Sequence, residues 1–269
     1  MPADVRVRYL RAQGAPLEKI YTLPAHSRTT IWANVENING ERPLASAEFA
    51  AEMSVVSGPA IIAERAMYLG GGAGSALFEA GHEAAGINAP APEWFFAEGA
   101  TGASFDTFIL LANPSSSEVS VQAEYLLDHG ALVTRRYVVP AASRRTVWLD
   151  HEDPRLAEVA ASVRLRSLDG TGFVAERAMW WPGPTAATWH EAHVSAGSTV
   201  SATRWAIADG VVQDQPGVTD TYVLIANVSA APARVRISLL FDDGGAPESR
   251  EFDISAASRF NVDVRTSFP

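Results

Sequence analysis

VSVQAEYLLDHG, residues 119–130, is the stretch of sequence that decides the fold. Apolar residues occupy every second position from Val119 to Leu127, and polar residues such as Gln122 and Glu124 stand between them. A side-chain period of two describes a β-strand that packs one face on a core. An amphipathic helix would instead repeat its apolar residues every three or four positions. The stretch therefore predicts a strand of an antiparallel sheet.

The same alternation recurs on both sides of this stretch. It predicts strands near residues 94–98, 106–112, 119–127, 132–139, 143–149, 160–168 and 172–181. Turn-forming pairs such as Asn113-Pro114 and Asp169-Gly170 separate several of them. After Asp153-Pro154 we expect a short helical turn, because Asp can cap it and Pro suits its first position. Seven strands within about 110 residues are typical of an Ig-like β-sandwich.

Several segments occur more than once along the chain. The pentapeptide AERAM stands at residues 63–67 and again at 175–179. The other matching segments are PAHSRTTIW (24–32) with PAASRRTVW (140–148) and SAASRFNVDV (255–264), WFFAEGATG (94–102) with WAIADGVVQ (205–213), FILLANP (108–114) with YVLIANV (222–228), and VSVQAEYLLDHG (119–130) with VRVRYLRAQG (5–14) and ARVRISLLFDDGG (233–245). Spacings of about 111 to 116 residues predict tandem copies of one structural unit with small loop insertions.

The repeat divides the chain into three units. We expect an incomplete first β repeat with a linker at 1–92, a complete β-sandwich at 93–203 and an incomplete third repeat at 204–269. The predicted fold is thus all-β, built of tandem Ig-like antiparallel sandwiches. Two stretches rich in small residues, 70–92 and 182–203, are linkers, binding loops or irregular strands.

Three explanations for the incomplete outer units stay open. The chain is a segment of a longer array, its domain boundaries are permuted, or partners complete each other end to end. The third explanation requires strand addition at unpaired sheet edges.

Composition excludes several classes of protein. The 269 residues carry a net charge of −10 and show no basic stripe, which argues against nucleic-acid binding. The chain has no cysteine, so disulfides, thiolate metal sites and thiol nucleophiles are excluded. It has no apolar run long enough for a membrane span. The first ten residues alternate Arg with apolar residues and are not a signal peptide.

The two linkers contain candidate metal ligands. Glu79 and His82 in the first linker recur as Glu191 and His193 in the second, beside His190. Carboxylates and imidazoles are ligands that divalent cations accept. The alternative is a Glu–His hydrogen bond that holds each long loop on its sandwich. No organic cofactor is expected.

Tryptophans are the best candidates for ligand binding, because indole rings stack on sugars and anchor protein partners. We expect Trp180, Trp181 and Trp189, beside a Pro-Gly loop, to be exposed and to form a ligand-binding surface. The tryptophans at repeated positions are expected in hydrophobic cores, namely Trp32, Trp94, Trp148 and Trp205.

The AERAM motif brings a glutamate and an arginine together at Glu64-Arg65 and Glu176-Arg177. A general base at Glu176 would need burial or an acidic neighbour, and the sequence fixes neither. We therefore expect exposed cross-strand ion pairs. The sequence has no nucleophile elbow, zinc-binding helix motif or P-loop, and we expect no enzyme activity.

The four motifs W-x-x-A-E-G, L-L-A-N-P, P-A-x-S-R-x-T-V and A-E-R-A-M-x-W-P-G resemble a repeat of large exported or surface proteins of environmental bacteria, an uncharacterised family. The resemblance covers nearly the whole chain. It implies a tandem β-sandwich in an extracellular or cell-surface protein and no assigned activity. Asp209, Val228 and Ser255 depart from the motifs, so the third copy is the most diverged.

The function predicted from these observations is a non-enzymatic structural or presentation module at the bacterial cell surface, with adhesion as an additional role. Its partners would be glycans or other surface proteins. One alternative is a carbohydrate- or protein-binding β-sandwich that uses exposed tryptophans. Another is a protomer that assembles with copies of itself through its incomplete ends.

Overall fold

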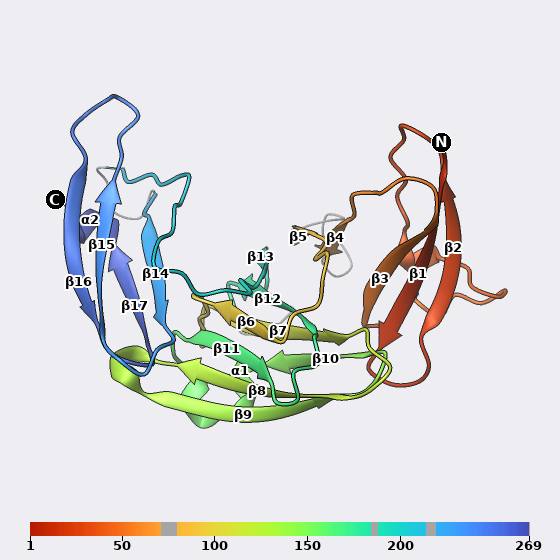
Figure 1. The fold of residues 1–269 in the computed structure, drawn as a ribbon, viewed down its shortest axis with the longest axis horizontal. Helices are drawn as coiled ribbons and strands as arrows, with labels where there is room; N and C mark the ends of the chain where they lie inside the picture. The colour runs from red at the N-terminus through yellow and green to blue at the C-terminus, as the bar shows by residue number, and fades with distance from the viewer. Residues whose placement is uncertain (71–79, 184–187, 214–218, 269) are drawn as a thin grey trace.

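The computed structural model describes residues 1–70, 80–183, 188–213 and 219–268. The protein is an all-β sandwich protein made of antiparallel sheets. The first unit and the third unit stand at opposite ends of a central sandwich (Figure 1). No helix within the described residues has the length and apolar character that a membrane crossing requires.

The central sandwich contains eight strands, which are β6 (Glu93–Phe96), β7 (Asp106–Asn113), β8 (Val119–Leu126), β9 (Leu132–Val139), β10 (Ser143–Trp148), β11 (Ser162–Ser167), β12 (Val174–Trp181) and β13 (Glu191–Ala196). One sheet has the order β6-β11-β8-β9, and the other has the order β10-β7-β12-β13. The seven strands predicted here from the alternation are confirmed. The eighth, β13, lies in the second linker and pairs with β12.

Three short helical segments accompany these strands: η2 (Asp128–Gly130), α1 (Leu149–Glu152) and η3 (Pro154–Leu156). The helical turn predicted after Asp153 is confirmed as η3. The Asp153 side chain accepts a hydrogen bond from the backbone N–H of Arg155 at 2.8 Å, as an N-cap does.

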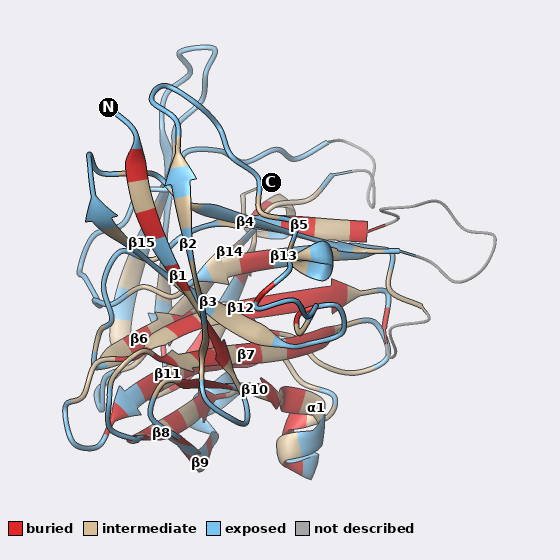
Figure 2. Ribbon diagram, turned by 90° about the vertical axis from the view of Figure 1, so that its right-hand side faces the viewer, coloured by how far each residue is buried: buried red, intermediate tan, exposed pale blue. Residues whose placement is uncertain are grey.

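The alternating pattern of β8 produces the central core. Val119, Val121, Ala123 and Tyr125 are fully buried, whereas the residues between them are half-buried. Figure 2 shows buried residues concentrated in the strands of the central sandwich. The core is completed by Trp94, Phe96, Ile109, Leu111, Val133, Tyr137, Val139, Val147, Leu149, Leu156, Val163, Leu165, Phe173 and Ala175.

The described residues of the first unit form two small sheets. The strands are β1 (Ala3–Arg11), β2 (Leu17–Leu23), β3 (Phe49–Ser57), β4 (Glu64–Leu69) and β5 (Ala80–Ala85), with the short turn η1 (Ala33–Val35). One sheet has the order β2-β1-β3, and β4 pairs with β5. These strands match β8, β9, β11, β12 and β13 of the central sandwich in sequence and in pairing.

The third unit matches a different part of the central sandwich. Its strands are β14 (Tyr222–Asn227), β15 (Ala233–Leu239), β16 (Glu248–Ile254) and β17 (Ser258–Asp263), followed by α2 (Val264–Ser267). The pair β14–β17 corresponds to β7–β10, and the pair β15–β16 corresponds to β8–β9.

Matching positions in different units make the same side-chain hydrogen bonds. The hydroxyls of Tyr125 and Tyr137 lie 2.8 Å apart across β8 and β9. Those of Tyr9 and Tyr21 lie 2.9 Å apart across β1 and β2. The sequence repeat therefore corresponds to repeated contacts as well as repeated strands.

An asparagine at the end of β7 ties together three backbone segments. The Asn113 amide donates to the carbonyls of Ser117 at 2.7 Å, Val139 at 3.0 Å and Pro140 at 2.9 Å. Its oxygen accepts from the backbone N–H of Ser115 at 3.0 Å. Because Ser117 lies between β7 and β8, and Val139 and Pro140 lie where β9 leads to β10, one side chain fixes the corner where the two sheets connect.

The matching Asn227 forms the same kind of corner in the third unit. It donates to the carbonyls of Ala231 and Ser255, both at 2.8 Å. Its oxygen accepts from the Ser229 backbone N–H at 3.1 Å. The L-x-A-N motif is thus a structural corner in both units that contain it.

The P-A-x-S-R motif forms a tight turn in all three units. Ser27, Ser143 and Ser258 each donate to the backbone carbonyl three residues earlier, at 2.7, 2.9 and 2.8 Å. The residue before each serine has a positive φ, which is 53° at His26, 48° at Ala142 and 45° at Ala257. The same left-handed backbone conformation at three matching sites defines a repeated turn.

Strand formation after this turn depends on the unit. Residues 143–148 form β10 and pair with β7. The similar residues 27–32 form no strand, because the described part of the first unit contains no counterpart of β7. A strand needs a neighbour for its backbone N–H and C=O groups, so the partner decides the outcome here.

We predict that Asn113→Ala lowers the free energy of unfolding by about 2–3 kcal/mol, because buried carbonyls lose their donor. Chemical denaturation followed by tryptophan fluorescence measures the change. The matched control is Asn34→Ala, since Asn34 is exposed, and its effect should stay below about 0.5 kcal/mol. Equal effects of the two substitutions would contradict the corner's role.

Candidate functional site

Aromatic side chains from several strands gather on one region of the central sandwich. Trp180 on β12 stacks on Trp189, with ring centroids 5.2 Å apart and an interplanar angle of 26°. Phe108 on β7 contacts Trp148 at 5.1 Å and Trp189 at 5.8 Å. His151 packs edge-on against Trp148 at 4.2 Å. We call Phe108, Trp148, His151, Trp180 and Trp189 the aromatic cluster.

A buried carboxylate orients two of these indoles. Asp106 is 1% exposed, and it accepts hydrogen bonds from Nε1 of Trp148 at 2.9 Å and from Nε1 of Trp189 at 2.6 Å. A shared charged acceptor fixes both ring planes. Nearby, burial raises the pKa of Asp150, an effect that the backbone N–H of Gly102 opposes and the charge of Asp106 reinforces.

The three tryptophans predicted to be exposed differ in their surroundings. Trp180 is 6% exposed, so that prediction is wrong for it. Its ring is covered by Trp189 on one side and by His82 of the first unit, 5.3 Å away. Trp181 and Trp189 are half-buried, and Trp181 contacts Phe105 at 5.9 Å.

The tryptophans at repeated positions do not all lie in a core. Trp94 is 2% exposed, and Trp148 is half-buried. Trp32 and Trp205 are 64% and 63% exposed, so the prediction that they are core residues is wrong. Each lies in a segment that forms no strand, and neither segment is held against a core by sheet pairing.

The predicted metal ligands in the described part of the chain do not form a cluster. Within the described residues, no group of three His, Asp or Glu side chains is placed to hold a metal ion. His82 on β5 and His193 on β13 belong to strands that pack side by side. Glu191 and His190 are exposed. Glu79 lies outside the described residues.

His82 is buried, and neither ring nitrogen has a hydrogen-bond partner in the described structure. Burial lowers the pKa of His82 to about 4, and the charges of Arg65 and His193 act in the same direction. The side chain is therefore neutral at pH 7. His82 is thus part of a buried contact between the first unit and the central sandwich.

The two AERAM copies contact each other. Nη1 of Arg65 on β4 lies 2.7 Å from Oε2 of Glu176 on β12. Arg177 is only 4% exposed; it pairs with Glu98 at 2.8 Å and donates to the Glu98 carbonyl at 2.9 Å. The prediction of an exposed ion pair is wrong for Arg177, because the motif arginine is buried against the glutamate of the A-E-G motif.

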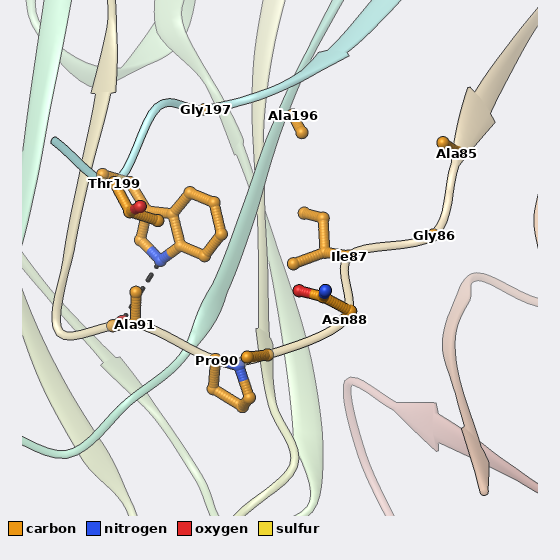
Figure 3. Close-up of a pocket in the computed structure, with 11 residues that line it drawn as sticks. Ala85, Gly86, Ile87, Asn88, Pro90, Ala91, Ala196, Gly197 and Thr199 are labelled. Carbon is orange, nitrogen blue, oxygen red and sulfur yellow. Dashed lines mark hydrogen bonds between the residues drawn. The ribbon is translucent and has the colours of Figure 1, made fainter. Parts of the chain in front are cut away.

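A pocket of about 490 Å³ lies between the segment after β5 and the end of β13. Figure 3 shows Ile87, Pro90 and Ala196 around it. The Trp94 indole forms part of its wall and donates to the carbonyls of Ala91 at 3.2 Å and Phe173 at 2.8 Å. The lining includes no charged side chain, so the pocket offers an apolar surface, backbone groups and the polar side chains of Asn88 and Thr199.

An arginine of the P-A-x-S-R motif crosses each junction between units. Arg144 is 8% exposed, and its Nη1 lies 2.6 Å from Oε2 of Glu48 in the first unit. Arg259 is 4% exposed; its backbone N–H donates to the Leu127 carbonyl at 3.2 Å, and its Nη1 lies 3.8 Å from Asp128. The sequence predictions missed these contacts, although an arginine repeated in all three copies was a visible signal.

No protein-family model matches this sequence, and no characterised protein matches it. Two solved structures show a limited likeness. A crystal structure of Thermotoga maritima 1070 has a TM-score of 0.35 and 14% identity, over 42% of this chain and 96% of that chain. The Anabaena sensory rhodopsin transducer has a TM-score of 0.29 and 14% identity, over 34% of this chain and 86% of that chain. TM-scores this low do not establish a shared fold.

The neutral state of His82 predicts a pH dependence. Since the pKa of His82 is about 4 in the folded chain and about 6.5 in the unfolded chain, the unfolded state binds more protons between these values. Stability should therefore fall as pH falls from about 7 to about 4. Urea denaturation of the wild type and of His82→Leu across this range measures the effect.

The His82→Leu variant should show a smaller loss of stability over the same pH range. The matched control is His129→Leu, since His129 is exposed. If the free energy of unfolding changed equally with pH in the wild type and in the His82 variant, the buried neutral imidazole would be contradicted.

Proposed function

We propose that this chain is a structural and presentation module of an exported or cell-surface repeat protein, without enzyme activity. One observation carries the proposal: the residues that recur in the sequence motifs make structural contacts within a unit or across a junction. Examples are Asn113 at its corner, Arg177 with Glu98, and Arg259 with Leu127. The contacts within a unit hold its sandwich together, and the contacts across a junction position neighbouring units relative to one another.

A module that sets a distance must hold its units in fixed orientations. The junction arginines supply that property, because a buried guanidinium requires its partners to stay in place. Burial lowers the pKa of Arg259, while the charges of Asp128 and Glu98 act in the opposite direction. The attraction of these acidic groups thus favours the docked arrangement.

Surface location rests on the resemblance of the motifs. It is tested by treating intact cells of the source organism with a protease and probing with an antibody against this chain. A presentation module is cleaved or labelled on intact cells. Protection until the cells are lysed would overturn the surface location.

The rigid-spacer role predicts a narrow distance distribution between spin labels on the central and third units. Because the chain has no cysteine, Arg136→Cys and Glu248→Cys, both at exposed positions, introduce the only label sites. Double electron–electron resonance measures the distribution. Arg259→Met should broaden it, since the Asp128 contact is lost.

The matched control for this measurement is Arg234→Met, because Arg234 pairs with Asp253 inside the third unit. It should leave the distribution unchanged. A broad distribution before any arginine is changed would contradict a rigid spacer.

A second candidate function is binding of a glycan or protein at the aromatic cluster. Trp189 favours it, since this half-buried indole is fixed by Asp106. Aromatic rings held in a fixed orientation suit stacking on sugar rings.

A titration with soluble polysaccharides, followed by tryptophan fluorescence, tests this candidate. A binding site at the cluster predicts a saturable change that Trp189→Ala removes and Trp205→Ala, at an exposed site in another unit, retains. No saturable change with any polysaccharide would count against glycan binding.

A further inference from the structure

The two junction arginines share one contact within their own units. In each, Nη2 of the junction arginine donates to the side chain two residues later, from Arg144 to Thr146 at 2.5 Å and from Arg259 to Asn261 at 2.6 Å. Nη1 of each arginine faces an acidic residue of the preceding unit, Glu48 for Arg144 and Asp128 for Arg259. The turn of the P-A-x-S-R motif is therefore a docking element that presents an arginine to the end of another unit.

The first unit carries a third copy of this docking element. Residues 24–28 keep the turn, with a φ of 53° at His26 and the hydroxyl of Ser27 donating to the Pro24 carbonyl at 2.7 Å. Residues 24–30 are all exposed. Among the described residues, Arg28 forms no ion pair and no hydrogen bond, unlike Arg144 and Arg259.

The third unit carries the matching acceptor. The hairpin pairs Ala233 with Ile254 as the central hairpin pairs Val119 with Val139, so that in sequence residues 241 and 242 correspond to Leu127 and Asp128 of the central unit. The acceptor thus consists of the Phe241 carbonyl and the Asp242 carboxylate.

The end of the β15–β16 hairpin, which contains this acceptor, also exposes apolar side chains. Leu240 is 80% exposed and Phe241 is 44% exposed, whereas Leu126, the counterpart of Leu240, is 2% exposed. Asp242 and Asp243 beside them are exposed as well. Exposed apolar residues with adjacent carboxylates complement a turn that presents an arginine.

We propose that residues 240–243 of one molecule dock on residues 24–30 of a second copy of this chain, with Arg28 binding the Phe241 carbonyl and the Asp242 carboxylate. The occupant is a second copy because the same chain carries both halves of the contact that Arg259 makes with Leu127 and Asp128 at one of its own junctions. Since the two surfaces differ, the contact is head-to-tail and repeats along an open chain of molecules. The inference rests on the junction contacts and is independent of surface location.

The contact between separate molecules is weaker than the internal junctions. Covalent linkage gives the internal junctions an effective concentration in the millimolar range. A contact built on one arginine and one hairpin end is small and therefore transient in solution. Disulfide trapping detects such a contact, and the absence of native cysteine leaves no background reaction.

The experiment uses the full chain with Thr30→Cys in one preparation and Asp243→Cys in another. The two are mixed under mild oxidation, and peptides joined between positions 30 and 243 are quantified by mass spectrometry. Trapping should exceed by about tenfold that of a control in which Arg6→Cys, at an exposed position on β1, replaces Thr30→Cys.

Charge reversal tests the assigned arginine. Arg28→Glu in the Thr30→Cys chain should reduce trapping to the control level, and Asp242→Arg in the partner should restore it. Trapping equal to the Arg6→Cys control, or unaffected by Arg28→Glu, would overturn the proposal. Neither outcome changes the spin-label result at Arg259, so failure of the docking contact is distinguishable from failure of the spacer role.

Discussion

A strand exists in this protein only where a neighbouring strand receives its backbone hydrogen bonds. The comparison of residues 143–148 with residues 27–32 isolates this constraint, because the two segments have nearly the same sequence. The first pairs with β7 and is a strand, and the second has no such neighbour and is irregular. Trp205 follows the same rule, since its segment matches β6 but lacks the partner that β11 gives to β6. The side-chain pattern therefore predicts where a strand can form, and the presence of a neighbouring strand determines whether it forms.

This constraint explains how much of the fold the sequence could predict. In the central sandwich the alternating residues of β8 and β11 predicted their strands correctly, because both neighbours of each strand are present. The exposure of Trp32 and Trp205 could not be predicted, since each matches a tryptophan in a paired strand. The pattern of one segment carries no information about whether its partner is in place.

The predictions about exposure at the candidate site were wrong for a different reason. Trp180 was expected to be exposed beside its Pro-Gly loop, but its cover comes from Trp189 and from His82 of another unit. Arg177 was expected to face outward, but Glu98, far away in sequence, pairs with it. Period-two alternation identifies the two faces of a strand but not what packs on each face. Contacts between units, such as Arg65 with Glu176, are invisible to local pattern.

The left-handed residue of the P-A-x-S-R turn limits how the sequence of each unit can change. His26, Ala142 and Ala257 adopt φ values that glycine, asparagine and aspartate tolerate well and β-branched residues do not. Such a backbone costs about 1 kcal/mol or more for an L-residue other than these. Each turn therefore holds strain that surrounding contacts must offset. Substitutions at the left-handed residue are therefore restricted to small or polar residues. The arginine two positions later is constrained separately, by the unit that it contacts.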